Sequence, residues 1–167
     1  MATDKTIPQN IVPTPYERYE DEIVALLQMP GIEVMTLPTT ETLEAPRPTA
    51  KPIIYVLVNG GEFAEREETA TVAQLETIQC ELFFRARTRR GKLGLFEVYE
   101  QAKRRLLGHR MQGAKNPIYF NSFGYVSGIQ NCWQYALTFS FGAYSIQSEQ
   151  SDNIPAITQI THEITEK

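Results

Sequence analysis

The side chains most often used in catalysis are few in this chain of 167 residues. It contains two histidines, His109 and His162, and two cysteines, Cys80 and Cys132. A cysteine beside a histidine can act as a nucleophile, and the sequence alone does not say whether any of them meet in space. Both cysteines lie in segments with a strand pattern, where buried, unreactive thiols are the usual case. We therefore expect no catalytic residues and no disulfide, with both thiols buried and reduced, as in a protein made in a cytoplasm.

Four carboxylates lie close together between residues 62 and 71: Glu62, Glu65, Glu67 and Glu68. Paired carboxylates can bind a metal ion or share acid–base work, but no histidine or other ligand type is close in sequence. The chain also lacks the GxGxxG, P-loop, CxxC, HExxH and GxSxG motifs. The glutamates thus predict a solvated loop, and we expect no enzyme activity, no cofactor and no metal.

A run of basic residues consists of Arg85, Arg87, Arg89, Arg90 and Lys92. It has three interpretations. Such a run could bind nucleic acid. Alternatively, Arg85 and Arg87 lie on the solvent face of a strand, and the others lie in an exposed turn. The third interpretation is an interface between subunits. A sequence pI near 5.3 argues against a free-standing DNA-binding protein.

The distribution of charge favours the third interpretation. Residues 1–75 carry a net charge of −7, residues 76–116 carry +6, and residues 117–167 carry −3. Opposite potentials on one chain select the register and orientation of contacts between copies. We expect the five basic residues to meet the acidic first half of a neighbouring copy in a ring. Charges that merely solvate separate faces remain the alternative.

The first half of the chain predicts one helix and two strands. A capping box at Thr14 and Glu17, with Pro15 at the first helical position, starts a helix over residues 15–29, which Pro30-Gly31 ends. Residues 31–37 predict a short strand and residues 38–52 a proline-rich loop. The continuous apolar run Ile53–Val58 is typical of a central strand covered on both faces, and Asn59-Gly60-Gly61 should end it.

The second half predicts three strands around a second helix. Residues 75–87 alternate, with Ile78, Cys80, Leu82, Phe84 and Ala86 on one face. A turn over residues 88–92 leads into a helix over residues 93–107 that stops at Gly108. Residues 117–126 and 131–144 predict strands that pair through a turn at 127–131. In the latter strand, alternate positions from Trp133 to Ala143 face the core, and Gln134, Thr138 and Ser140, like Phe83, face outward.

The predicted organisation is a single domain with an arm at each end. Residues 1–13 form a flexible arm, residues 14–145 the α+β domain and residues 146–167 an extended tail. In that tail Thr158, Ile160, His162 and Ile164 fit one strand face, and its β-branched residues favour a strand. No apolar run approaches 18 residues, so we expect no membrane span. The N-terminus lacks the apolar core of a secretory signal, so we expect no secretion by the Sec route.

The order of these segments resembles the tail-terminator, or tail-completion, proteins of long-tailed bacteriophages, in their Mu-like, contractile-tail branch. The likeness spans about residues 14–144 and is carried by four runs of the sequence. They are IIYVLVNGGEFAE, QLETIQCELFFRARTRRG, KLGLFEVYEQAKRRLLG and WQYALTFSF.

The resemblance implies both a fold and a function. The fold is α+β: a mixed, mostly antiparallel sheet of about four to six strands with two main helices packed on it. Such proteins form a hexameric ring that caps the head-proximal end of the tail tube, stops its polymerisation and joins tube and sheath to the neck. The implied partners are the tube, sheath and neck proteins, with DNA passing through the lumen without sequence-specific binding. The implied location is the neck-proximal end of the virion tail, after synthesis in the host cytoplasm.

Two other functions compete with this one. Another neck or head-to-tail connector subunit belongs to the same class of assembly proteins. A small cytoplasmic enzyme or ligand-binding domain, with a pocket between helix and sheet, belongs to a different class. A strand formed by the Ile/Thr-rich tail could also add to the sheet edge of a neighbouring subunit.

Overall fold

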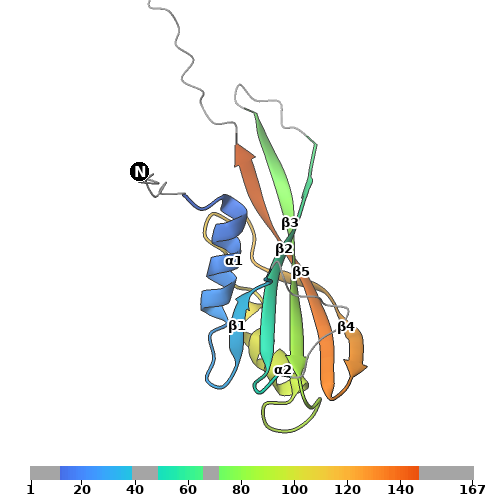
Figure 1. Cartoon of the computed structure of the whole chain (residues 1–167). Coiled ribbons are helices and arrows are strands. Elements are labelled where there is room, and N and C mark those ends of the chain that lie inside the picture. Colours follow the sequence, from blue (N-terminus) through green and yellow to red (C-terminus); the bar gives the residue numbers. More distant parts are fainter. Residues whose placement is uncertain (1–11, 39–48, 66–71, 147–167) are drawn as a thin grey trace, which may run out of the picture.

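The computed structural model describes residues 12–38, 49–65 and 72–146, and Figure 1 shows how their elements are arranged. In chain order the elements are α1 (Pro15–Leu26), β1 (Glu33–Thr36), β2 (Ile53–Phe63), β3 (Ala73–Ala86), α2 (Leu95–Leu106), β4 (Tyr119–Ile129) and β5 (Cys132–Ile146). The strands form one five-stranded sheet in the order β1-β2-β3-β5-β4. The β1–β2 pair is parallel and the other pairs are antiparallel, which confirms the predicted α+β fold.

The start of α1 follows the predicted capping box. The Thr14 hydroxyl accepts a hydrogen bond from the Glu17 backbone N–H at 3.3 Å, and the Glu17 carboxylate accepts one from the Thr14 N–H at 2.6 Å. These bonds satisfy N–H groups that have no partner within the helix. The helix ends at Leu26, three residues earlier than predicted, although Leu27 and Met29 beyond it are still buried in the core.

Both helices pack on the same face of the sheet. The predicted apolar face of β3 lies here, and so do alternate residues of β2 and β5. Four side chains on this face are completely buried: Ile23 of α1, Leu27 just after it, and Leu95 and Leu106 of α2. An aromatic group closes the core beside β4, where the rings of Tyr99 and Phe123 stack with centroids 3.7 Å apart. The helices therefore share one hydrophobic core, as their amphipathic patterns predicted.

The opposite face of the sheet is less exposed than predicted. Ile53, Tyr55 and Phe83 form a second, smaller cluster there, with exposed fractions of 5–7%. Burial on both faces confirms that the start of β2 is a central strand. The expectation that Phe83, Gln134 and Ser140 face outward was wrong, because all three are buried, whereas Thr138 is partly exposed.

The glycine pair after Val58 bends β2 rather than ending it. The register with β3 shifts between Val58 and Gly60, and Gly60 has φ of +140°. Pairing then resumes, with Gly61 opposite Ile78. A Cβ at Gly61 would lie 2.1 Å from the Glu76 carboxylate, so any larger residue here would displace that side chain. The predicted strand end at Asn59 was therefore wrong, and Glu62 and Phe63 belong to β2 rather than to the predicted loop.

A tight hairpin joins β4 to β5. Gln130 and Asn131 have φ of +50° and +60°, which matches a two-residue turn of type I′. The predicted pairing of these strands is thus confirmed, with β4 running further, to Ile129. β5 also pairs with β3 over the whole length of β3, from Ala73 opposite Ile146 to Ala86 opposite Trp133.

The predicted arms and parts of two predicted loops lie outside the described residues. These are residues 1–11, 39–48, 66–71 and 147–167. Residues 66–71 include Glu67 and Glu68 of the predicted glutamate-rich loop, and residues 147–167 contain the predicted tail strand. Among the helices that the structure describes, none has the length and apolar character needed to cross a membrane.

Candidate functional site

The connection between β3 and α2 forms an exposed basic surface, which we call the basic turn (Arg87, Arg89, Arg90 and Lys92). Gly91 has φ of +85° and Leu93 has φ of +57°, so the chain reverses tightly here. The Leu93 N–H donates to the Glu97 carboxylate at 2.6 Å, which fixes the turn to the first turn of α2. The four basic residues are therefore held on a well-defined loop.

Two members of the basic turn are anchored and two are not. The Arg89 guanidinium lies over the Trp133 ring, 4.6 Å from its centroid, and Arg87 Nε donates to the Thr49 carbonyl at 2.8 Å. Within the described part of the chain, no ion pair involves Arg90 or Lys92. The charges of Arg90 and Lys92 are therefore available to a partner.

Arg85 does not belong to this surface. Strand alternation places it on the second face of the sheet, where 2% of the residue is exposed. Its Nε donates to Gln134 Oε1 at 2.9 Å, and its guanidinium lies 5.0 Å from the centroid of the Tyr55 ring. The expectation that Arg85 lies on a solvent face was wrong, and it does not join the other four basic residues.

Acidic residues of α1 line a groove on another part of the molecule. The groove has a volume of about 340 Å³ and is lined by Pro13, Glu17, Glu20, Asp21 and Thr36. Glu20 accepts a hydrogen bond from the Val58 N–H at 2.9 Å, which fixes it against β2. The bond from the Thr14 N–H lowers the pKa of the Glu17 carboxyl, so the charged form is favoured. We call this surface the acidic groove.

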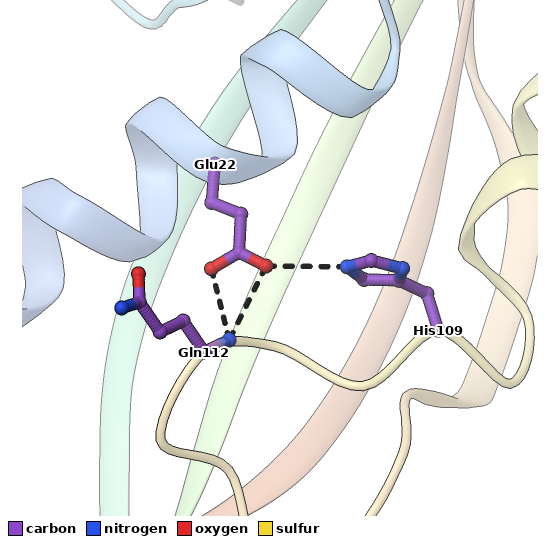
Figure 2. A network of polar contacts seen from close by, with 3 residues as sticks. All are labelled: Glu22, His109 and Gln112. Atoms are coloured by element: carbon purple, nitrogen blue, oxygen red, sulfur yellow. Dashed lines mark hydrogen bonds and ion pairs between the residues drawn. The ribbon is translucent and has the colours of Figure 1, made fainter.

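A third carboxylate of α1 has an internal role, shown in Figure 2. Glu22 Oε1 lies 3.2 Å from His109 Nε2, and both carboxylate oxygens accept from the Gln112 backbone N–H, at 3.0 and 3.2 Å. His109 and Gln112 belong to the segment between α2 and β4. Glu22 therefore tethers this segment to α1 and is not part of the acidic groove.

The two cysteines, which were expected to be unreactive, lie in the interior of the protein. Cys80 and Cys132 are free and buried, as predicted. Burial raises the pKa of the Cys80 thiol to about 12, so the thiolate that a nucleophile requires is disfavoured. Among the described residues, no group of three His, Cys, Asp or Glu side chains could hold a metal ion. His162 lies outside the described residues.

An apolar groove of about 720 Å³ was not predicted from the sequence. It lies where the start of α1 meets the ends of β2 and β5, and its walls include Tyr16, Tyr19, Phe63, Tyr144 and Ile146. The buried Glu76 carboxylate accepts hydrogen bonds from the Tyr16 hydroxyl and, at 2.8 Å, from the Ser145 hydroxyl. The first of these bonds, more than burial, raises the pKa of Tyr16 to about 12. The signal in the sequence was a glutamate in the apolar phase of β3.

Comparison with protein-family models gives a match. The model is described as Gp37 protein and matches residues 23–164, which include every strand, α2 and the last four residues of α1. The match also continues through 18 residues beyond β5. No curated protein matches the chain.

Proposed function

Because the chain belongs to the Gp37 protein family, which is phage-related, we propose that it is a structural protein of a bacteriophage tail. Within that class we assign it the role of tail terminator. Copies form a ring that caps the head-proximal end of the tail tube, stops tube growth and joins tube and sheath to the neck. DNA passes through the ring without sequence-specific contacts, and no substrate is turned over.

The observation that carries this proposal is the family match over residues 23–164, which covers the whole sheet and α2. The fold agrees with what the resemblance to tail terminators implies, because two helices pack on one face of a mixed sheet. The contractile-tail assignment follows from that resemblance.

The ring is proposed to form through contacts between unlike surfaces. Arg90 and Lys92 of the basic turn meet Glu17 and Asp21 of the acidic groove on the next copy. The two surfaces lie on different elements, so every copy contributes one of each. Contacts of this head-to-tail kind form a ring when the rotation between successive copies closes. Six copies are the number that the resemblance to tail terminators implies.

Deleting the gene for this protein from the phage tests the proposed function. Without a terminator, tube growth is unchecked, so tails assembled in its absence should be longer than wild type and uneven in length. Expression of the chain from a plasmid should restore the normal length. Tails of normal length that fail to join heads would instead indicate a head-to-tail connector, and phage with normal, joined tails would refute both assignments.

A further inference from the structure

The outer edge of β4 is a long, open edge of the sheet. β4 is the last strand in the sheet order and has 11 residues, against four in β1 at the other edge. Among the described residues β4 pairs with β5, and no further polar contact involves its backbone. Its outward N–H and C=O groups can therefore pair with another strand.

The side chains of β4 do not protect this edge. The strand reads YFNSFGYVSGI and contains no charged residue and no proline, the usual devices that prevent edge pairing. Four of its apolar side chains are 44–59% exposed: Tyr119, Tyr125, Val126 and Ile129. Two bulges, between Phe120 and Ser122 and between Tyr125 and Ser127, bend the strand and are the protective device that β4 does carry. An edge of this kind is typical of a surface that is covered in the assembled state.

The chain itself supplies a segment suited to that edge. The sequence continues for 21 residues beyond Ile146, where β5 ends. Residues 154–164, IPAITQITHEI, match β4 in length and are rich in β-branched residues. Their proline stands at the second position, close to the end of a strand, where it is tolerated. The family match includes this segment, since it extends to residue 164.

The route of the chain favours pairing between copies. Tyr119, the first residue of β4, lies opposite Ser140, so β5 continues for six residues past the start of β4. Residues 114–116 lie along this stretch of β5, where the Lys115 N–H donates to the Gly142 carbonyl at 2.7 Å and the Asn116 side chain accepts from the Gly142 N–H at 2.9 Å. A tail returning to its own β4 must pass around this segment. This obstruction favours a neighbouring copy as the source of the added strand.

We propose that the β4 edge binds residues 154–164 of a neighbouring copy as an added strand. This inference rests on the proposed ring. It adds a backbone-to-backbone contact to the charge contacts between the basic turn and the acidic groove. Backbone hydrogen bonds supply the affinity in such pairing, and apolar side chains at alternate positions set the register.

Disulfide cross-linking between two tagged, full-length chains tests the proposal. One chain carries Val126→Cys, at an exposed bulge position that lies outside the paired register, so no cross-strand pair is lost. The other carries one cysteine at each of residues 156–164 in turn. The native Cys80 and Cys132 are each 1% exposed and should give little background. The matched acceptor control is Glu33→Cys, which is exposed on β1 at the opposite edge of the sheet.

Added-strand pairing predicts cross-links between the two tagged chains at alternate tail positions, because successive strand residues face opposite sides. The Glu33→Cys control should cross-link at least tenfold less. Four results would overturn the proposal. They are equal yield at consecutive positions, cross-links within one chain when both cysteines are on it, dimers through Val126→Cys alone, and no cross-linking above the control. The proposed function is tested separately, by tail length in phage that lack this protein. A negative cross-linking result would therefore overturn the strand pairing and leave the proposed function untouched.

Discussion

Glu22 and Gln112 are 90 residues apart in sequence, yet both oxygens of the Glu22 carboxylate lie within hydrogen-bond distance of the Gln112 backbone nitrogen, at 3.0 and 3.2 Å. The same carboxylate contacts His109 at 3.2 Å (Figure 2). One side chain of α1 thus holds the segment that leads from α2 into β4.

We predict that Glu22→Ala weakens the tether. The substitution leaves the Gln112 N–H and the His109 ring without their acceptor, which should lower the free energy of unfolding by about 1–2 kcal/mol. Glu22→Gln keeps one acceptor oxygen and should cost less. Denaturant unfolding at neutral pH measures both values, with Asp21→Ala on the same helix as the control. Equal stability of Glu22→Ala and wild type would contradict the assigned role.

The surroundings of Arg85 should matter for stability and those of Arg90 should not, although both residues belong to the basic run. Gln134→Ala removes an acceptor from the buried Arg85 guanidinium and should cost about 2–3 kcal/mol of unfolding free energy. Arg90→Glu changes an exposed side chain and should alter stability by less than about 0.5 kcal/mol. Thermal and denaturant unfolding of the two variants test this difference. A destabilised Arg90→Glu variant would mean that the basic turn has a structural role.

Charge exchange tests the proposed contact between copies. Arg90→Glu or Asp21→Lys alone should impair ring formation on tail tubes about tenfold or more, because each places like charges opposite one another. A chain carrying both changes restores opposite charges at every contact and should recover assembly. Each single variant should fold normally, since both side chains are exposed. If the double variant assembles no better than either single one, these two residues do not face each other in the ring.

Alkaline solution should destabilise the fold through Tyr16. Its pKa is raised from 10.0 to about 12, so its contribution is fully present below pH 10 and is lost as the pH rises towards 12. Cys80, raised from 9.0 to about 12, acts in the same direction from about pH 9. Tyr16→Phe should be about 1 kcal/mol less stable at pH 7 and should lose less stability between pH 10 and 12. The exposed Tyr119→Phe is the control, and parallel pH profiles for wild type and Tyr16→Phe would refute the Tyr16–Glu76 contact.

Local patterns in the sequence were enough to predict the order of the elements. The capping box at Thr14 and the alternation from Ile78 to Ala86 depend on neighbouring residues, and the structure confirms both. The alternation of apolar residues also predicted the core face of β5 correctly. Such patterns report the geometry of one segment, which is why they succeed without knowledge of the whole fold.

Burial on the second face of the sheet could not be predicted in this way. Alternation separates Arg85 and Gln134 from the helix-covered face, but it does not say whether the other face is exposed. The Gly60-Gly61 pair is equally ambiguous, because positive φ permits either a strand end or a bulge. Glu76 depends on Tyr16, which lies 60 residues away on α1. Each of these features is set by contacts between distant segments.

Reconstruction of the head-proximal end of the phage tail by electron microscopy tests the central claim most directly. The account predicts a six-membered ring of this chain at the junction of tube and neck, with the basic turn of each copy against α1 of the next. Density for the chain at any other position in the particle, or its absence from purified tails, would contradict it.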